Sequence, residues 1–184
     1  MSIHRFAVTG AQGTGKTTLT RELHQLCARA IVGECQLLQG IGQRIKSMGH
    51  PSGSNTTSET LCAFAAEHVK REREATGRVI IQDRCLLDLL SYARVLGHRY
   101  DALGMLLCEI TITSILVIEK VFYLPITPGI QTTNVEVEDA EFRLKIDEEI
   151  RASAETLGLT LYPVEGSMEE RLSKAFQLIM TTAC

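Results

Sequence analysis

Several features are missing from this sequence, and each absence narrows the class of protein. No apolar stretch approaches the roughly 18 residues that a membrane span requires, so we expect no contact with a membrane. The N-terminus enters an apolar strand pattern at once, which is unlike a signal peptide. Tryptophan is absent and aromatic residues make up only 5% of the chain, so the aromatic side chains are expected to serve mainly the core.

An excess of positive charge is also missing. The chain carries 19 Lys and Arg against 22 Asp and Glu, so its formal net charge is −3 and gives no electrostatic reason to expect general nucleic-acid binding. The six cysteines form no C-x-x-C pair and have no zinc-ligand spacing. Scattered cysteines inside apolar patterns are typical of reduced thiols used as small apolar residues, which predicts a cytoplasmic location.

The length and composition indicate one globular domain. With 184 residues, 45% of them hydrophobic and 22% charged, the chain is long enough for one well-buried α/β domain and too short for two. No internal repeat, charge block or low-complexity linker divides it, so residues 1–184 are expected to form a single domain. The sequence leaves the oligomeric state open.

Apolar runs typical of buried parallel strands alternate with longer helical patterns. This alternation predicts an α/β fold with five parallel strands in one sheet and helices on both faces, a three-layer sandwich. Thr56 followed by Glu59 indicates a capping box at the start of the third helix. The strands are expected at Phe6–Thr9, Ala30–Gly33, Val79–Gln82, Val121–Leu124 and Thr160–Pro163. The helices are expected at Lys16–Arg29, Leu37–Met48, Thr57–Ala75, Leu86–Leu96, Ala102–Ile115, Ala140–Leu157 and Met168–Met180.

The most specific motif is a phosphate-binding loop near the N-terminus. Residues Gly10–Thr17 match the G-x-x-x-x-G-K-T (Walker A) pattern, between an apolar run and a helical pattern. The glycines let backbone N–H groups turn toward a β-phosphate, and the helix start adds unpaired donors and the positive end of its dipole. A glycine-rich turn that carries Lys-Thr by chance is the alternative. The residues expected to bind ATP are Gly10, Ala11, Gln12, Gly13, Thr14, Gly15, Lys16, Thr17 and Thr18.

Two polar groups are expected to act on the phosphates and two on the acceptor side. Lys16 is expected to reach the β- and γ-phosphates, and the Thr17 hydroxyl to ligate Mg²⁺. The third apolar run ends in Asp83-Arg84. Asp83 would bind Mg²⁺ through water or accept a proton from a substrate hydroxyl, and Arg84 would hold a substrate oxygen or phosphate. The alternative is a structural Asp-Arg pair that caps the next helix.

Glu34 and Arg143 are weaker catalytic candidates. Glu34 ends the expected second strand, where a carboxylate would serve as general base; a helix cap or a solvent-exposed charge explains it equally well. Arg143 follows a long irregular segment and would bring a cation to the transferring phosphate, unless it lies on a solvated helix face. His68 and the pair Arg71 and Arg73 are interpreted as a buried-edge histidine and a solvated face.

Two loops at the expected carboxyl edge of the sheet are candidates for ligand binding. The lid-like segment at about residues 125–142 contains no arginine between Ile126 and Glu138 and is acidic near its end. The turn Gly166-Ser167 follows the fifth strand, where backbone groups would meet the edge of an adenine ring. Ser167 would also cap the last helix together with Glu170.

Taken in order, these motifs resemble those of the small P-loop kinases, the superfamily of nucleoside, nucleoside-monophosphate and nicotinamide-riboside kinases. The chain is most similar to a compact ATPase/kinase-like family typified by the nicotinamide-riboside kinase domain of bacterial NAD regulators. The matching motifs span nearly the whole chain: Gly10–Thr17, the D-R-x-x-x-D-x-x-x-Y run from Asp83 to Tyr92, Phe122–Pro125, Asp139–Arg143 with Asp147, and Val164–Ser167 with Glu170-Arg171.

The resemblance implies a sheet in the order 2-3-1-4-5, ATP with Mg²⁺, and a small acceptor that bears a hydroxyl or phosphate group. The leading hypothesis is an ATP-dependent kinase that transfers the γ-phosphoryl group to a nucleoside-like molecule. A regulatory ATP-binding domain that signals to a protein partner is the alternative. Lids in such kinases tend to carry two or more arginines, whereas the lid-like segment of this chain has none between Ile126 and Glu138. A nucleoside-monophosphate acceptor is less favoured, since its phosphate needs more cations than the sequence offers.

Overall fold

A five-stranded parallel sheet forms the centre of the molecule. The computed structural model describes residues 3–31, 35–127 and 140–183. The strand order is β2-β3-β1-β4-β5, as the sequence predicts, and all neighbouring strands run parallel. The five strands are β1 (His4–Thr9), β2 (Cys35–Leu38), β3 (Val79–Asp83), β4 (Lys120–Tyr123) and β5 (Leu161–Pro163).

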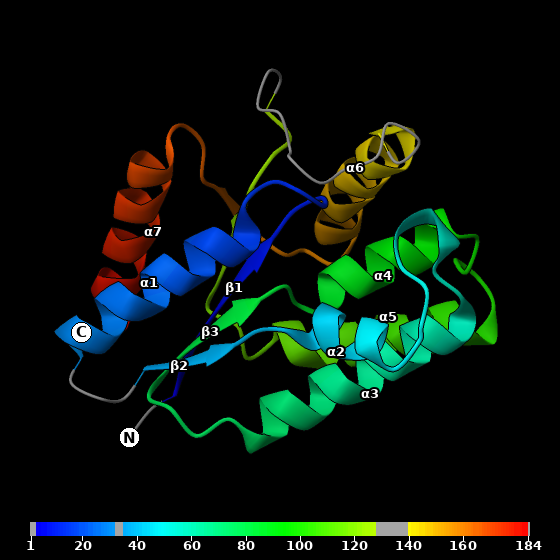
Figure 1. The fold of residues 1–184 in the computed structure, drawn as a ribbon, viewed down its shortest axis with the longest axis horizontal. Coiled ribbons are helices and arrows are strands. Elements are labelled where there is room, and N and C mark those ends of the chain that lie inside the picture. Colours follow the sequence, from blue (N-terminus) through cyan, green and yellow to red (C-terminus); the bar gives the residue numbers. More distant parts are fainter. Residues whose placement is uncertain (1–2, 32–34, 128–139, 184) are drawn as a thin grey trace.

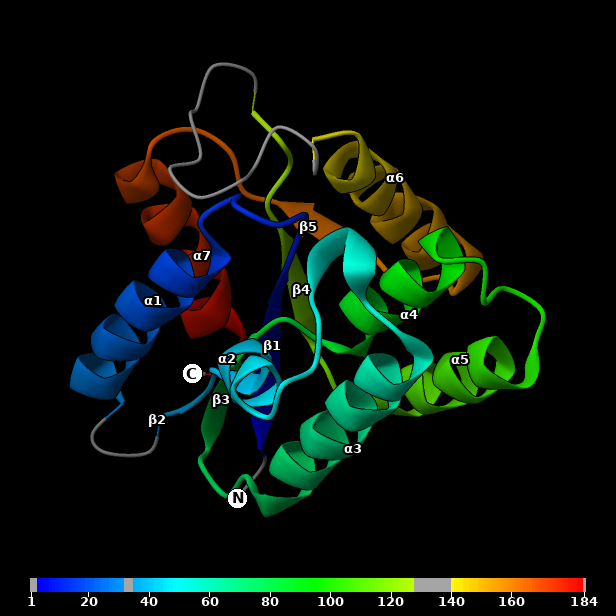
Figure 2. The same cartoon turned by 45° about the vertical axis from the view of Figure 1, so that its right-hand side comes forward.

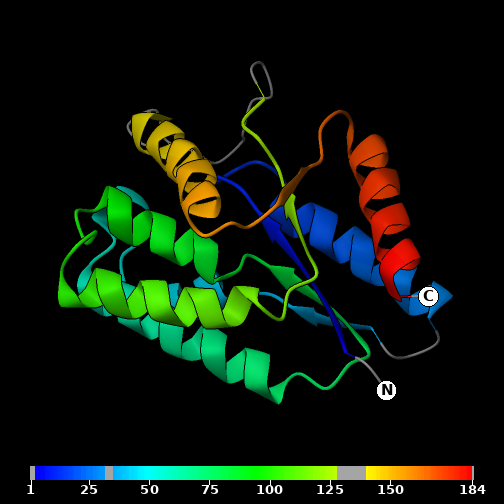
Figure 3. The ribbon, with the colours of Figure 1, turned by 180° about the vertical axis from the view of Figure 1, so that it is seen from behind.

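Helices cover both faces of the sheet. Helices α1 and α7 lie on one side and α3, α4, α5 and α6 on the other (Figure 1), and the view from behind shows the same three layers (Figure 3). The helices are α1 (Lys16–Ala30), α2 (Ile41–Ser47), the short 3₁₀ helix η1 (Gly53–Asn55), α3 (Ser58–Glu74), α4 (Leu86–Val95), α5 (Ala102–Ile115), α6 (Ala140–Thr156) and α7 (Met168–Ala183).

Alternate residues of the strands feed two separate cores. On β1, Phe6 and Val8 pack with residues of α1 and α7, whereas Ala7 packs with residues of α4 and α6. The two-residue period of a strand sends successive side chains to opposite faces, so a strand buried on both faces must be apolar throughout. No helix of the described residues is long and apolar enough to cross a membrane.

The second strand is the main boundary that the sequence analysis placed wrongly. The run Ala30–Gly33 was expected to be a strand, but α1 continues through Ala30, and Ile31 is buried with 8% exposure. Ile31 extends the four-residue spacing of Leu19, Leu23 and Cys27 and is buried in the same core. Its apolar side chain therefore packs with those of α1 and does not begin a strand.

The real second strand begins at Cys35 and includes residues that were assigned to a helix. Leu37 pairs with Ile81 of β3, and α2 begins only at Ile41, after Gly40 with a φ of 78°. The cap of α3 is also one residue later than expected. Thr57 caps this helix by accepting a hydrogen bond from the Thr60 N–H, 3.3 Å away.

Candidate functional site

The phosphate loop has the strand–loop–helix setting that its sequence predicts. It leaves β1 after Thr9 and enters α1 at Lys16. Gly10, Gly13 and Gly15 have φ values of 144°, 74° and 92°, a region that side chains rarely adopt. A Cβ atom at Gly10 would also collide with the Leu124 carbonyl oxygen, so the path of the loop beside β4 requires glycine there.

Lys16 is buried inside this loop. Its side chain is 5% exposed, and its Nζ donates hydrogen bonds to the Ala11 carbonyl, 2.5 Å away, and to the Thr14 hydroxyl, 3.5 Å away. Burial lowers the pKa of Lys16 from 10.5 to about 7. The nearby guanidinium groups of Arg84 and Arg143 contribute to this lowered pKa, while the carboxylates of Asp88 and Asp83 oppose it. A bound anion would restore the charged form of Lys16, which is what a phosphate site requires.

The carboxylate of Asp83 lies beside the phosphate loop. Asp83 ends β3, paired with Val8 of β1, and its Oδ2 accepts a hydrogen bond from the Thr17 hydroxyl at 2.7 Å. Its other oxygen, Oδ1, is buried and has no hydrogen-bond partner among the described residues. A hydroxyl and a carboxylate with a spare oxygen are the ligand types that Mg²⁺ prefers, so the residues present fit a magnesium ion.

Arg84 continues the chain from Asp83 in an unusual conformation. It is the one residue other than glycine, among those described, with a positive φ, which is 79°. Its backbone N–H donates to the Val8 carbonyl at 3.0 Å, and its Nη1 donates to Asp88 at 3.3 Å. Burial opposes the charge of Arg84, but Tyr92 and the nearby carboxylates hold its pKa above the ordinary value, so Arg84 is a half-buried cation. Backbone strain of this kind concentrates at functional sites.

Asp88 is a site residue to which the sequence analysis gave no role. It is 2% exposed, and its Oδ2 accepts hydrogen bonds from the Thr9 hydroxyl and the Cys85 N–H, both at 3.0 Å. Asp88 therefore caps α4. The alternative interpretation, in which Asp83 and Arg84 are a structural pair that caps this helix, assigned the cap to other residues. Its position three residues after Cys85 is the spacing of a capping carboxylate, and that signal was available in the sequence.

A cavity of about 610 Å³ opens on the other side of Asp83. Helices α2 and α3, the turn around η1 and the start of α4 form its walls. In Figure 2, α2 is drawn in front of the strands, and the chain after it leads to the start of α3. Both apolar rings and polar groups reach it. Among the lining residues are Thr17, Gln39, Lys46, Leu61, Phe64, His68, Arg71, Asp83, Arg84, Leu89 and Tyr92.

Two of these residues were interpreted as having no role in a site. His68 is buried, as expected, but it lines the cavity. Arg71 is not part of a solvated face, because its Nη1 donates to the Gln39 carbonyl at 2.6 Å and its Nε to Glu67 at 2.7 Å. Phe64, His68 and Arg71 recur at helical spacing on α3, a pattern that a helix core and a ligand cavity share.

The remaining predicted residues differ in their positions. Arg143 lies on α6, close enough for its charge to lower the pKa of Lys16, and its Nε is buried without a hydrogen-bond partner in the described part of the chain. Thr18 is exposed on the first turn of α1. Gly166, with a φ of 93°, precedes the capping box in which the Ser167 N–H donates to Glu170 at 2.7 Å.

Glu34 lies outside the described residues. The strand that was expected to end there instead begins at Cys35, which pairs with Val79 at the amino end of β3. The carboxyl end of β2 is Leu38, and Gln39 follows it into the wall of the cavity. The argument for a general base at the end of the second strand therefore no longer applies to Glu34.

Comparison with protein families gives a match to the family described as AAA domain over residues 5–171. No curated protein matches the chain. Among solved structures, NadR protein in complex with NAD and AMP-PNP has a TM-score of 0.77 and 15% identity, and the match covers 98% of this chain and 49% of that chain. The present chain thus spans about half the length of that NadR chain.

Two smaller proteins match over their whole length. Deoxyadenosine kinase from M. mycoides has a TM-score of 0.64 and 14% identity, covering 96% of this chain and 99% of its own. Thymidylate kinase from Ehrlichia chaffeensis has a TM-score of 0.67 and 15% identity, with 97% and 100% covered. At these identities the likeness establishes the P-loop kinase fold, and the substrate is a separate question.

Proposed function

Because the chain belongs to the AAA domain family and has the fold of the P-loop kinases, we propose that it is an ATP-dependent small-molecule kinase. The acceptor that we propose is a nucleoside-like molecule, a nucleoside or nicotinamide riboside, bound in the cavity beside Asp83. The whole chain, residues 1–184, is proposed to act as one kinase domain in the cytoplasm, without nucleic acid or membrane as a partner.

The position of Asp83 carries this proposal. Its carboxylate accepts the hydrogen bond from Thr17 of the phosphate loop, and the same residue lines the 610 Å³ cavity. A carboxylate that borders both the phosphate loop and the cavity is suited to orient an acceptor hydroxyl toward a terminal phosphate. Phosphoryl transfer depends mainly on such positioning and on charge neutralisation.

Each loop residue has a proposed task. The backbone N–H groups of Gly10–Thr18 and the side chain of Lys16 would hold the triphosphate, and Gly166-Ser167 would meet the adenine edge. Thr17 and Asp83 would hold Mg²⁺, which would offset charge on the phosphates. Arg143 would add its guanidinium, whose Nε has no hydrogen-bond partner among the described residues, at the transferring phosphate, where a positioned cation stabilises developing charge.

Two arginines of the cavity wall favour an uncharged acceptor over a nucleoside monophosphate. Arg71 is paired with Glu67 at 2.7 Å, and Arg84 is paired with Asp88 at 3.3 Å. Both of these guanidinium groups already have a carboxylate partner, so an acceptor phosphate that used either of them would have to displace an ion pair. A neutral ribose and base make no such demand.

A regulatory ATPase is the second candidate function. The arginine-free sequence of residues 126–138 supports it, since such kinases tend to place arginines in this segment. Arg143 argues against a regulatory ATPase, because this residue of α6 would supply the cation that lid arginines supply in such kinases.

One experiment separates these functions. The protein is incubated with ATP and Mg²⁺ and a panel of nucleosides, nicotinamide riboside and nucleoside monophosphates, and phosphorylated products are identified by mass. We expect one nucleoside-like acceptor to be phosphorylated by the wild type and none by Lys16→Ala. ATP hydrolysis that no acceptor stimulates would favour the regulatory ATPase, and phosphorylation of monophosphates alone would move the acceptor class to nucleotides.

A further inference from the structure

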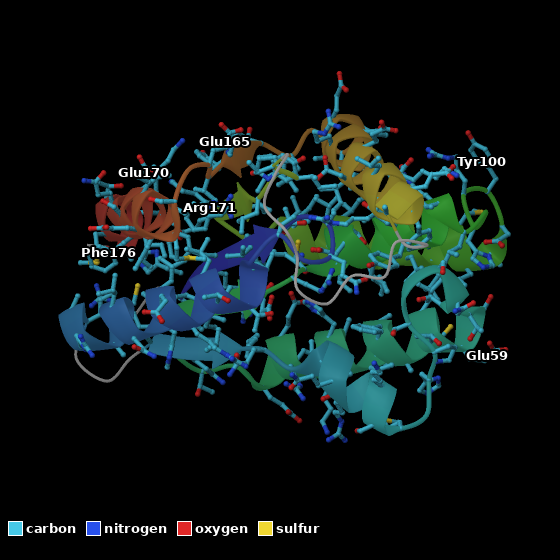
Figure 4. All side chains as sticks on the ribbon, turned by 45° about the horizontal axis from the view of Figure 1, so that its top comes forward. Glu59, Tyr100, Glu165, Glu170, Arg171 and Phe176 are labelled. Carbon is cyan, nitrogen blue, oxygen red and sulfur yellow. The ribbon has the colours of Figure 1, made fainter. Side chains whose placement is uncertain are left out.

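Arg171 is buried next to the phosphate loop, although it belongs to the last helix of the fold. It is 5% exposed, and its Nη1 donates a hydrogen bond to the Thr14 carbonyl at 3.0 Å. Its Nη2 donates to the Thr127 hydroxyl at 3.4 Å, and its Nε is buried without a partner among the described residues. Figure 4 shows Arg171 on the side of α7 toward the sheet and α1, whereas Glu170 is on the outer side.

The guanidinium packs on the backbone of the loop itself. A Cβ atom built on Gly15 would lie 3.8 Å from the Arg171 Nη1 and 3.6 Å from the Met168 side chain. Thr14 is held from inside as well, since its hydroxyl donates to the Ala11 carbonyl at 3.0 Å. The segment between two positive-φ glycines, Gly13 and Gly15, is therefore fixed from α7 through a single carbonyl.

The electrostatics of Arg171 need an explanation. No carboxylate of the described residues forms an ion pair with it, and its partners are a carbonyl and a hydroxyl. Burying a cation without a counter-charge costs free energy, so such groups are retained where an anion binds. The phosphate loop that Arg171 contacts also contains the buried side chain of Lys16, so two buried basic residues lie against this loop.

We propose that Arg171 is a positioning residue of the ATP site. It holds the phosphate loop in its binding shape through the Thr14 carbonyl, and its charge favours a bound polyphosphate over a neutral ligand. This inference rests on the proposed function in that it takes ATP as the ligand of the loop. It assigns no contact between Arg171 and the acceptor.

Two variants at this position separate charge from shape. Arg171→Met removes the charge and the hydrogen bonds, and Arg171→Lys keeps the charge but not the planar fork that reaches two acceptors. Lys174→Met, three residues further along α7, removes an exposed cation and serves as the matched control. Binding of ATP, ADP and adenosine is measured by titration calorimetry, and folding is measured by urea unfolding of the same samples.

We expect Arg171→Met to weaken ATP binding by about 10–100-fold, because a charge-assisted hydrogen bond and a nearby charge are both lost. ADP binding should fall less and adenosine binding least, whereas a purely structural residue would affect all three alike. Arg171→Lys should recover part of the ATP affinity, and Lys174→Met should bind ATP as the wild type does. If Arg171→Met does not fold, the comparison of ATP with adenosine in Arg171→Lys decides the matter.

The outcomes distinguish this inference from the proposed kinase activity. A folded variant at position 171 with wild-type ATP affinity, or with equal losses for ATP and adenosine, would overturn the inference and leave the kinase untouched. Selective loss of ATP binding in a protein that phosphorylates no acceptor would support the inference and remove the kinase proposal.

Discussion

Lys16 shows at the scale of one residue how the electrostatics of the phosphate loop suit a bound anion. Its ammonium group is 5% exposed, and burial, together with Arg84 and Arg143, lowers its pKa to about 7. The charged form is disfavoured in the folded protein alone and is favoured once phosphate oxygens surround it. The residue that we propose to bind ATP is therefore a source of instability in the free protein.

The pH dependence of stability follows from this pKa. Between pH 7 and 10.5 the unfolded chain holds a proton on Lys16 that the folded chain has released, so the free energy of unfolding rises with pH in this window. Relative to Lys16→Met, the wild type should gain about 2–3 kcal/mol between pH 7 and 9, at about 1.4 kcal/mol for each pH unit. Urea unfolding of both proteins at several pH values measures this difference; a constant difference would contradict the lowered pKa.

Asp83 leads to a prediction about catalysis. Asp83→Asn keeps the shape of the side chain but removes the negative charge that faces Thr17 and the cavity. The rate of phosphoryl transfer should fall by about 100-fold or more, while ATP affinity changes by less than about 10-fold, as expected for a group that acts mainly in the transition state. Single-turnover rates and ATP titrations measure the two effects separately. Equal losses in rate and affinity, or a loss of stability alone, would argue that Asp83 is structural.

At the scale of elements, the sequence predicted the parts of the fold that short sequence patterns identify. It did not predict the parts that depend on packing between residues far apart in the chain. The phosphate loop and β3 with its terminal Asp83 could be predicted, because the pattern of neighbouring residues is enough to identify each of them. The second strand was misplaced because Ile31 completes a helical spacing that only the packed α1 reveals. Arg171 was not predicted as a site residue, because its partner Thr14 lies 157 residues earlier in the chain.

The first turn of α5 provides a test of close packing away from the site. A Cβ atom at Gly104 would lie 2.7 Å from the carbonyl carbon of His98 and closer still to its oxygen. Gly104→Ala should therefore destabilise the protein by about 1–3 kcal/mol, as overpacking against backbone does. Thr113→Ala, at an exposed position of the same helix, should change stability by less than about 0.5 kcal/mol. Urea midpoints compare the two; similar effects would mean that the loop at His98 yields easily.

At the scale of the whole molecule, the site joins both halves of the sheet. The phosphate loop leaves the central strand β1, β3 supplies Asp83 from one side, and β4 approaches Gly10 from the other. Ligands of open α/β sheets bind at this edge, beyond the carboxyl ends of the strands. Binding at the junction of so many elements should stabilise the fold as a unit.

Thermal unfolding measures this coupling. ATP with Mg²⁺ at about 100 times its dissociation constant should add about 2.7 kcal/mol to the free energy of unfolding, which raises the midpoint by about 5–10 °C for a chain of this size. Lys16→Ala should show little or no rise at the same concentration. An equal rise in both proteins would show that ATP stabilises the chain from somewhere other than the phosphate loop.

The carboxylate of Asp88 has one further consequence for the proposed kinase. Asp88 accepts hydrogen bonds from Thr9 at the end of β1 and from Cys85 at the start of α4. It therefore links the strand that leads into the phosphate loop with the helix that borders the cavity. In the proposed kinase, this link would set how far an acceptor hydroxyl lies from the γ-phosphate of ATP. Discrimination between large and small acceptors would then depend on the opposite wall, α2 and η1, where substitutions would be made to change the size of the acceptor.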